Sequence, residues 1–257
     1  MKVTILGCGG SSGVPVIGNQ WGDCDPANPK NRRTRPSVLV EQGGVSVLVD
    51  TSPDLRQQLL AADVRRLDAV LWTHNHADHT HGLDDLREIC RLTQRPLPVY
   101  GMARHLEDIA GRFPYAFAPL KDGDPIYRPV LLPHAVDGPF HAAGLPVVPF
   151  VQDHGWMPTL GFRFGGFAYS TDVVRLDDAA FAALEGIEVW VVDCVRIEPP
   201  HAVHSHLAQT LEWIARVKPK RAYLTHMNQS MDYDTVTRLL PPGVMPAYDG
   251  LVIELDE

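Results

Sequence analysis

The stretch Leu71-Trp72-Thr73-His74-Asn75-His76-Ala77-Asp78-His79 decides how this sequence folds and which chemistry it can perform. In it, an apolar run is followed at once by three histidines and one aspartate within six residues. A turn that leaves a strand can aim four such side chains at one point. Neutral imidazoles bind Zn²⁺, Mn²⁺ and Fe²⁺, and a carboxylate supplies the negative charge that a divalent ion needs. The segment therefore predicts a metal site at the end of a β-strand.

Three further candidate ligands stand at or just beyond the end of other apolar runs: His154 after Val147–Val151, Asp172 after Phe167–Tyr169, and His226 after Arg221–Leu224. Strands that end at one edge of a sheet form a rigid support for a site. Four ligands from one turn are too few for two metal ions, and these three complete the set. We therefore predict a two-metal site with seven ligands: His74, His76, Asp78, His79, His154, Asp172 and His226.

Short apolar, β-branched runs recur along the chain and predict strands. They are Val3–Leu6, Ser37–Val40, Val45–Val49, Ala69–Trp72, Pro98–Tyr100, Val147–Val151, Gly161–Phe164, Phe167–Tyr169, Val189–Val192, Arg221–Leu224 and Leu251–Glu254. Three segments carry apolar residues at helical spacing: Pro53–Ala62 with Ser52 as N-cap, Leu83–Leu92, and Gln209–Val217. Many strands with few helices predict an α/β or α+β domain with two sheets and helices outside. No repeat or linker divides the sequence, so we expect residues 1–257 to form one domain.

The composition narrows the class of protein. Hydrophobic residues make up 45% and charged residues 21% of the chain, as in an ordinary globular protein. No apolar run approaches the ~20 residues that span a bilayer, and the glycine-rich start is unlike a signal peptide. Cys8, Cys24, Cys90 and Cys194 form no C-x-x-C pair, which indicates free thiols in a reducing compartment. We therefore expect a cytoplasmic protein without a membrane partner.

The charge of the chain bears on its partners. A formal net charge of -8 argues against broad binding of nucleic acid. A small anionic substrate remains compatible, because a bound metal pair can dominate the charge inside a pocket. Lys30, Arg32, Arg33 and Arg35 form a basic run in the long polar loop of residues 18–36. We interpret this run as solvated, and local attraction of a phosphate-bearing substrate is the alternative.

The order H-x-H-x-D-H, then His, Asp and His, resembles that of the metallo-β-lactamase superfamily over the whole chain. The resemblance implies a four-layer αββα sandwich, an α/β fold in which helices flank two mixed sheets. It also implies how the ligands divide: His74, His76 and His154 for one metal ion, Asp78, His79 and His226 for the other, with Asp172 bridging. Two metals ~3.5–4 Å apart can hold a bridging hydroxide as the nucleophile. The expected reaction class is metal-assisted hydrolysis.

Asp50 closes an early apolar run that ends Val-Leu-Val-Asp-Thr, as in that superfamily. One interpretation is that its carboxylate orients a metal ligand through a hydrogen bond. The other is that it caps the turn before Pro53. The sequence leaves both open.

Further motifs resemble one branch of the superfamily, which includes the PhnP-like phosphoribosyl 1,2-cyclic phosphate phosphodiesterases associated with carbon–phosphorus lyase. They are G-x-G-x-S-x-G-V-P-V at Gly7–Val16, the segment Arg32–Ser37, H-x-x-G-L-x-x-L-R at His79–Arg87, and Lys220–His226. The resemblance implies hydrolysis of a small, cyclic phosphodiester by two divalent ions, Mn²⁺ or Zn²⁺. Histidine and aspartate ligands also accept Fe²⁺. The resemblance also suggests a homodimer.

The same resemblance implies a histidine before the last ligand that acts as acid or hydrogen-bond donor to the leaving oxygen. The family motif places His204 at this position, with His206 as the close alternative and His201 as a weaker one. An exposed loop without a catalytic role is the remaining interpretation. The predicted catalytic residues are His204, Asp78 and Asp172.

One departure from the branch concerns a structural zinc. Its better-known members hold this ion by three closely spaced cysteines in the first long loop and a histidine three residues after the last catalytic ligand. Here the loop has only Cys24, and Gln229 stands at the histidine's position. A tetrahedral site needs four ligands, so we expect no structural zinc and a free thiol at Cys24. The loss leaves the substrate open, because this loop can lie beside the pocket.

Other functions remain open on the same fold. A tRNA 3′-processing endonuclease shares the glycine-rich opening and the ligand order, but the acidic balance and the lack of a basic arm oppose it. A lactonase or thioesterase needs no phosphate-binding donor near His204. A non-enzymatic binding protein is least favoured, because all seven predicted ligands are present. The other histidines lack partners at useful spacing, so His105, His134 and His141 are expected on the surface.

Overall fold

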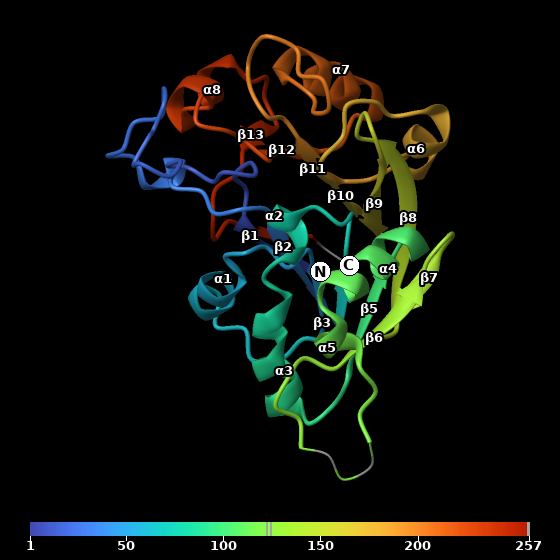
Figure 1. The fold of residues 1–257 in the computed structure, drawn as a ribbon. Helices are drawn as coiled ribbons and strands as arrows, with labels where there is room; N and C mark the ends of the chain where they lie inside the picture. Colours follow the sequence, from blue (N-terminus) through green and yellow to red (C-terminus); the bar gives the residue numbers. More distant parts are fainter. Residues whose placement is uncertain (122, 124, 256–257) are drawn as a thin grey trace.

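Figure 1 shows a computed structural model of the chain, which describes residues 1–255 except residues 122 and 124. In this part of the chain, two seven-stranded sheets pack face to face. Helices cover both outer faces, at the top and at the bottom of the view. The αββα arrangement expected from the resemblance is therefore confirmed.

The strands of the first sheet are short: β1 (Lys2–Gly7), β2 (Ser37–Gln42), β3 (Val45–Val49), β4 (Ala69–Leu71), β5 (Leu97–Gly101), β6 (Leu131–Ala135) and β14 (Val252–Glu254). The second sheet holds β7 (Phe140–Ala142), β8 (Leu145–Asp153), β9 (Pro158–Phe164), β10 (Phe167–Ser170), β11 (Val189–Asp193), β12 (Arg221–Thr225) and β13 (Val244–Pro246). Each predicted strand overlaps one of these. The sequence patterns do not indicate β6, β7 and β13.

The strand order places several carboxyl ends at one edge. The first sheet runs β14-β1-β2-β3-β4-β5-β6 and the second β13-β12-β11-β10-β9-β8-β7. Strands β3, β4, β5 and β6 run parallel to one another, as do β10, β11, β12 and β13, and the remaining pairs are antiparallel. Both sheets are therefore mixed. Parallel strands end on the same side, which is where ligand sites form in α/β proteins.

The helices form the outer layers. Those beside the first sheet are α1 (Leu55–Ala61), α3 (Leu86–Thr93), α4 (Ala103–Arg112) and α5 (Pro114–Phe117), and those beside the second are α6 (Asp178–Ala183), α7 (Leu207–Val217) and α8 (Tyr233–Leu239). The single turn α2 (Ala77–Thr80) follows β4. Among the residues that the structure describes, no helix has both the length and the apolar character needed to cross a membrane.

The start of α1 differs from the prediction. The helix begins at Leu55, and Asp54 occupies its N-cap position without a side-chain cap bond. The Ser52 hydroxyl accepts a hydrogen bond from the backbone N–H of Asp54 (3.1 Å) and donates to Gln58 Oε1 (2.9 Å). Ser52 as helix cap is therefore wrong, because its hydroxyl organises the turn before the helix.

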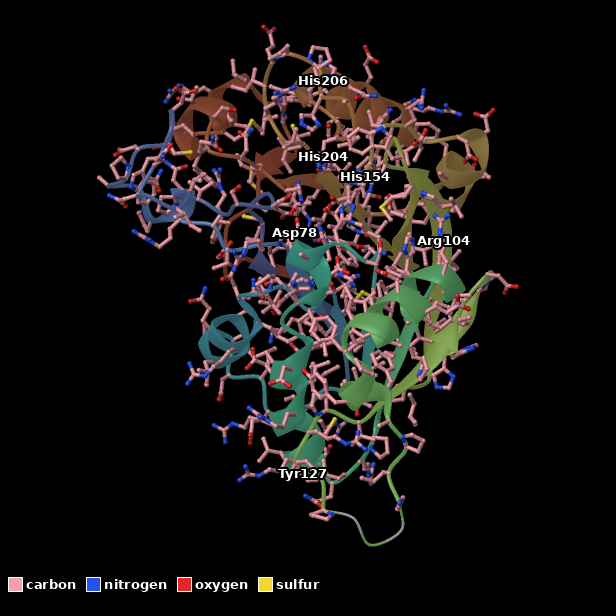
Figure 2. All side chains as sticks on the ribbon, viewed as in Figure 1. Asp78, Arg104, Tyr127, His154, His204 and His206 are labelled. Atoms are coloured by element: carbon pink, nitrogen blue, oxygen red, sulfur yellow. The ribbon has the colours of Figure 1, made fainter. Side chains whose placement is uncertain are left out.

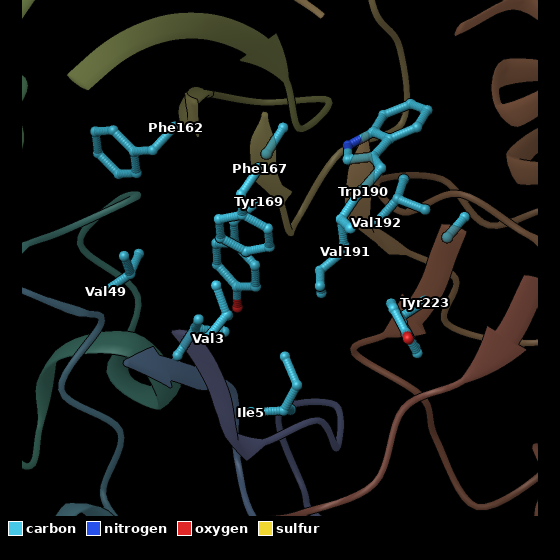
Figure 3. Close-up of a cluster of buried hydrophobic side chains, with 14 of the residues drawn as sticks. Val3, Ile5, Val49, Phe162, Phe167, Tyr169, Trp190, Val191, Val192 and Tyr223 are labelled. Atoms are coloured by element: carbon cyan, nitrogen blue, oxygen red, sulfur yellow. The ribbon is translucent and has the colours of Figure 1, made fainter. Parts of the chain in front are cut away.

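In strands of the first sheet, alternate residues point into two different cores. In β3, Val49 packs into the core between the sheets, whereas Leu48 packs with Leu55 of α1 in a second core beneath the helices. Figure 3 shows part of the first core, to which the second sheet contributes Phe162 and Tyr169. Dense packing on both faces gives the strand ends a rigid base.

The loop of residues 18–36 is not solvated throughout. Arg33 is only 2% exposed. Its guanidinium donates to Asn31 Oδ1 (3.2 Å) and to the backbone oxygens of Met231 (2.6 Å) and Asn228 (3.5 Å). The solvated interpretation is therefore wrong for Arg33, because these oxygen acceptors compensate the loss of water around its charge.

Candidate metal centre

The predicted ligand turn leaves β4 and brings four side chains into one cluster. His74 and His79 are completely buried and Asp78 is nearly so, whereas His76 is exposed. The turn α2 carries Asp78 and His79, and the Thr80 hydroxyl donates to the backbone oxygen of His76 (2.8 Å). The rings of His74 and His76 lie with their centroids 4.4 Å apart.

Strand ends of the second sheet supply the other predicted ligands. His154 follows β8, Asp172 follows β10, and His226 follows β12, and all three are buried. Figure 2 shows His154 near Asp78 where the two sheets meet. Asp172 and His226 have positive φ angles of 53° and 58°. This conformation costs a non-glycine residue about 1–2 kcal/mol, and such strain is concentrated at functional sites.

Asp172 lies at the centre of the cluster, and each of its carboxylate oxygens faces a different set of histidines. Its Oδ2 lies 3.7 Å from His74 Nε2 and 3.4 Å from His154 Nε2. Its Oδ1 lies 3.1 Å from His79 Nε2 and 3.3 Å from His226 Nε2. Among the described residues, three groups have ligand atoms within 4.8 Å of one another: His74, His76, His154 and Asp172; Asp78, His79 and His226; and Asp172, His204 and His226. The structure thus brings together all seven residues predicted as ligands.

Buried polar atoms without a partner are concentrated in this cluster. Within the described residues, His74 Nε2, His79 Nε2, His226 Nε2 and Asp78 Oδ2 are buried and make no hydrogen bond. Such an atom costs about 1–3 kcal/mol, and native proteins normally pair it. Imidazole nitrogens and carboxylate oxygens are the donors that Zn²⁺ and Mn²⁺ accept. These residues therefore fit bound divalent ions.

Asp50 orients one of the predicted ligands. It is completely buried after β3, with a φ angle of 64°. Its Oδ2 lies 2.7 Å from His79 Nδ1, and its carboxylate accepts hydrogen bonds from the backbone N–H (2.8 Å) and hydroxyl (2.9 Å) of Thr73. A proton on Nδ1 leaves Nε2 of His79 free to bind a metal. The structure favours this interpretation over capping of the turn.

Of the alternatives before the last ligand, the structure brings His204 to the cluster. His204 is 7% exposed, its ring stacks on His226 at 4.5 Å, and its Nε2 lies 3.9 Å from Asp172 Oδ2. His206 stands at the N-cap of α7, and Figure 2 shows it farther from the cluster. The ring of His201 lies 5.0 Å from that of His204, so it borders the site without entering it.

Asp193 is a site residue that the sequence patterns do not reveal. It is completely buried at the end of β11, and its Oδ2 lies 3.3 Å from His204 Nδ1. The same oxygen accepts the backbone N–H of Ser205 (3.1 Å), and Oδ1 lies 3.8 Å from His226 Nδ1. The usable signal is that Asp193 closes an apolar strand just as Asp50 does.

Opposite charges shift the pKa values of the most buried groups. Burial lowers the pKa of His79, but the carboxylates of Asp172, Asp78 and Asp50 outweigh burial and raise it well above its usual value. Burial raises the pKa of Asp172, but the imidazoles of His226 and His79 hold it well below its usual range. The centre therefore holds ionised carboxylates among imidazoles, a combination suited to cations.

The other histidines of the cluster divide into two kinds. Burial lowers the pKa of His74, His76 and His154, which favours the neutral imidazole that metal binding requires. Burial also lowers the pKa of His204, but Asp193 and Asp172 outweigh burial and raise it to about 9. His204 is therefore placed to hold a proton at neutral pH.

The structure corrects one prediction among the remaining histidines. His105 is only 1% exposed, and its Nε2 lies 3.1 Å from the backbone oxygen of Pro158. Its surface assignment is wrong, because this carbonyl satisfies the imidazole inside the fold. His134 and His141 are exposed, as predicted.

Two mixed sheets between helices, with a histidine–aspartate cluster at their shared edge, define a hydrolase of the metallo-β-lactamase fold. The chain belongs to the β-lactamase superfamily, since the model of the beta-lactamase superfamily domain matches residues 46–227.

Similarity to known proteins indicates one branch of this superfamily. The chain is similar to the crystal structure of a new diphosphatase from the PhnP family, with a TM-score of 0.89 and 34% identity over 99% of this chain and 98% of that one. It is 34% identical over 260 residues to an octanoyltransferase of Porphyromonas gingivalis, covering 100% of this chain but 52% of that protein. A ribonuclease Z of Bradyrhizobium sp. is 44% identical over 66 residues, 25% of this chain and 22% of the relative. The chain thus spans about half the length of the octanoyltransferase, and its resemblance to the PhnP-like branch is confirmed.

Proposed function

We propose that this chain is a binuclear metal-dependent phosphodiesterase that hydrolyses a small phosphodiester, such as a phosphoribosyl 1,2-cyclic phosphate. The observation that carries the proposal is the position of Asp172, whose two oxygens face two separate sets of imidazole nitrogens. Similarity to a PhnP-family diphosphatase along nearly the whole chain supports chemistry at phosphorus. Residues 1–257 would form one hydrolase domain that works in the cytoplasm.

Six residues divide into two sets around the shared Asp172: His74, His76 and His154 for one ion, and Asp78, His79 and His226 for the other. Mn²⁺, Zn²⁺ and Fe²⁺ all suit ligands of this kind. When bound, two such ions supply an activated water and neutralise the charge of the phosphate.

The chain's own residues account for the proton that the leaving group needs. Asp193 lies 3.3 Å from Nδ1 of His204, which leaves Nε2 directed at the cluster. Burial lowers the pKa of His204, but Asp193 and Asp172 raise it to about 9, which favours the protonated imidazole that can donate to a leaving oxygen. Burial raises the pKa of Asp78 and Asp172, but neighbouring imidazoles outweigh it and keep both carboxylates ionised.

The test combines elemental analysis of the purified protein with hydrolysis of bis-p-nitrophenyl phosphate and a ribose cyclic phosphate under added Mn²⁺ or Zn²⁺. We expect about two metal ions per chain and metal-dependent turnover of both substrates. Two metals with turnover of lactones or thioesters but not of phosphodiesters would move the assignment to that class. Protein that contains no metal ion and binds none when it is added would contradict the assignment of the metal site.

A second candidate function is cleavage of a diphosphate, which the diphosphatase relative favours. A diphosphate linkage presents the same tetrahedral, negatively charged phosphoryl centre as a phosphodiester. Measuring kcat/KM for a dinucleoside diphosphate and for the cyclic phosphodiester at equal metal concentration distinguishes the two candidate functions. A higher kcat/KM for the diphosphate would select this candidate.

A further inference from the structure

Helix α4 holds the ligand turn from outside. Asn75, which separates His74 from His76, donates from Nδ2 to Asp108 Oδ2 (2.6 Å). Arg112 donates from Nη2 to the same carboxylate oxygen (2.6 Å) and to the backbone oxygen of Asn75. Both the side chain and the backbone of Asn75 are therefore bound to α4.

The same guanidinium reaches the far end of the turn. Arg112 Nη1 donates to His81 Nε2 (3.1 Å), and His81 is the C-cap residue of α2. Arg112 thus contacts both ends of residues 75–81, which carry three of the predicted ligands. A planar guanidinium with five N–H donors can join two such points, whereas a lysine ammonium acts as a single point charge.

His76 depends on this contact more than its neighbours do. His74 and His79 are completely buried, and each has its Nδ1 in hydrogen-bond contact, with Thr73 (3.0 Å) and Asp50 (2.7 Å) respectively. The ring of His76 is exposed and has no hydrogen-bond partner among the described residues. Its position is therefore set by the backbone of the turn, which α4 holds.

We propose that Arg112 and Asp108 are positioning residues that hold His76 ready to bind a metal ion and so set the affinity of the His74–His76–His154 site. The inference rests on the metal assignment in the proposed function. Loss of groups that orient a ligand typically lowers metal affinity by about 10- to 100-fold. The two side chains are 32% and 48% exposed, and ion pairs so exposed contribute little to stability. A loss of metal affinity with an unchanged fold therefore distinguishes positioning from a structural role.

The test titrates metal-free protein with Mn²⁺ or Zn²⁺ against a chelator and resolves two binding steps. Arg112→Ala is expected to weaken one step by about 10- to 100-fold and leave the other and the Tm unchanged. Arg112→Lys should also bind metal more weakly at this step, because an ammonium cannot hold both ends of the turn. Arg91→Ala is the matched control, since this arginine of α3 is exposed and pairs with Glu88 (3.4 Å).

Two further readouts identify the affected site without using activity. His76→Ala should weaken the same step, and adding Arg112→Ala to it should cause no further loss, because both act through one residue. In metal-free protein, hydrogen–deuterium exchange of residues 74–81 should be faster in Arg112→Ala than in the wild type or the control. The inference would be overturned if Arg112→Ala bound both metal ions with wild-type affinity. It would also be overturned if this variant lost affinity equally at both sites and had a lower Tm. A wild-type protein that binds no metal would instead remove the proposed function and the inference with it.

Discussion

Asp172 is the residue that both predicted metal sites share. Its oxygens lie 3.1–3.7 Å from four imidazole nitrogens. We expect Asp172→Ala to bind fewer than two metal ions and to hydrolyse substrate at least about 100-fold more slowly, because loss of mere orienting groups already costs 10- to 100-fold. Elemental analysis and hydrolysis of bis-p-nitrophenyl phosphate measure both. Asp178→Ala, whose carboxylate is exposed and pairs with Arg216 (2.7 Å), is the control; full metal content and rate in Asp172→Ala would contradict the assignment.

His204 is expected to protonate the leaving oxygen. His204→Ala removes none of the seven predicted ligands, so both metal ions should be retained. General acids contribute about 10²- to 10⁴-fold to rate, and the loss should be greatest for poor leaving groups. Rates for alkyl and nitrophenyl phosphodiesters measure this difference, with His206→Ala at the N-cap of α7 as the control. Equal slowing of both substrates would indicate a role in binding instead.

Single site residues can be predicted from the sequence where their type and order indicate a particular chemistry. The H-x-H-x-D-H turn is such a case, and the structure brings its side chains together. Asp193 is not predicted, because an aspartate at a strand end is commonly a cap, and its contact with His204 depends on how the next loop folds. The predicted surface position of His105 is wrong for a similar reason, since its hydrogen-bond acceptor, the backbone oxygen of Pro158, is 53 residues away.

Among whole elements, several of those that escape prediction have few buried apolar residues or an interrupted apolar face. Strand β6 buries only the first of its five residues, and β7 is three residues long at the edge of its sheet. Helix α6 buries only Ala180. Helix α4 buries His105 beside Leu106 and Ile109, so a polar residue interrupts its apolar stripe. Periodicity detects an element only when its buried face is apolar.

Arg33 fastens the loop of residues 18–36 to the segment after β12. Replacing it by methionine leaves the backbone oxygen of Met231 without this donor, whereas Asn31 Oδ1 still accepts the backbone N–H of Tyr233 (2.7 Å). We expect Arg33→Met to lower the free energy of unfolding by about 1–3 kcal/mol, because an unsatisfied buried group costs about that much. Urea denaturation measures this loss. Arg32→Met is the matched control, since Arg32 is exposed and its guanidinium lies over the Trp21 ring, 5.0 Å from the centroid. Equal effects of both changes would show that Arg33 does not anchor the loop.

For the whole molecule, the candidate metal centre exists only when the two sheets are docked. The first sheet contributes the ligand turn, and the second contributes the three ligands that follow β8, β10 and β12. A backbone hydrogen bond from Leu160 of β9 to Thr73 (2.9 Å) joins the sheets beside the turn. Since no single sheet holds a complete set of ligands, metal binding and docking of the sheets are coupled.

Asp249 ties together three distant segments and makes stability depend on pH. Its half-buried carboxylate accepts hydrogen bonds from the backbone of Cys8 (3.1 Å) and from the backbone (2.7 Å) and hydroxyl (2.6 Å) of Thr34. Burial is the largest influence and raises the pKa of Asp249 to about 6, above the ~3.9 of an unfolded chain. The folded state therefore binds this proton more tightly. The resulting stabilisation is fully present below about pH 4 and is lost as the pH rises through about 6.

We therefore expect the unfolding free energy of the wild type, minus that of Asp249→Asn, to increase by about 2–3 kcal/mol from pH 7 to pH 4. The asparagine loses some hydrogen bonding at every pH, but this loss shifts the difference by a constant. All other titrating groups are common to both proteins and cancel. Urea denaturation at pH 4, 5, 6 and 7 measures the difference. A difference that stays constant over this range would mean that Asp249 is ionised in both the folded and the unfolded chain, and that its carboxylate is better solvated than its burial implies.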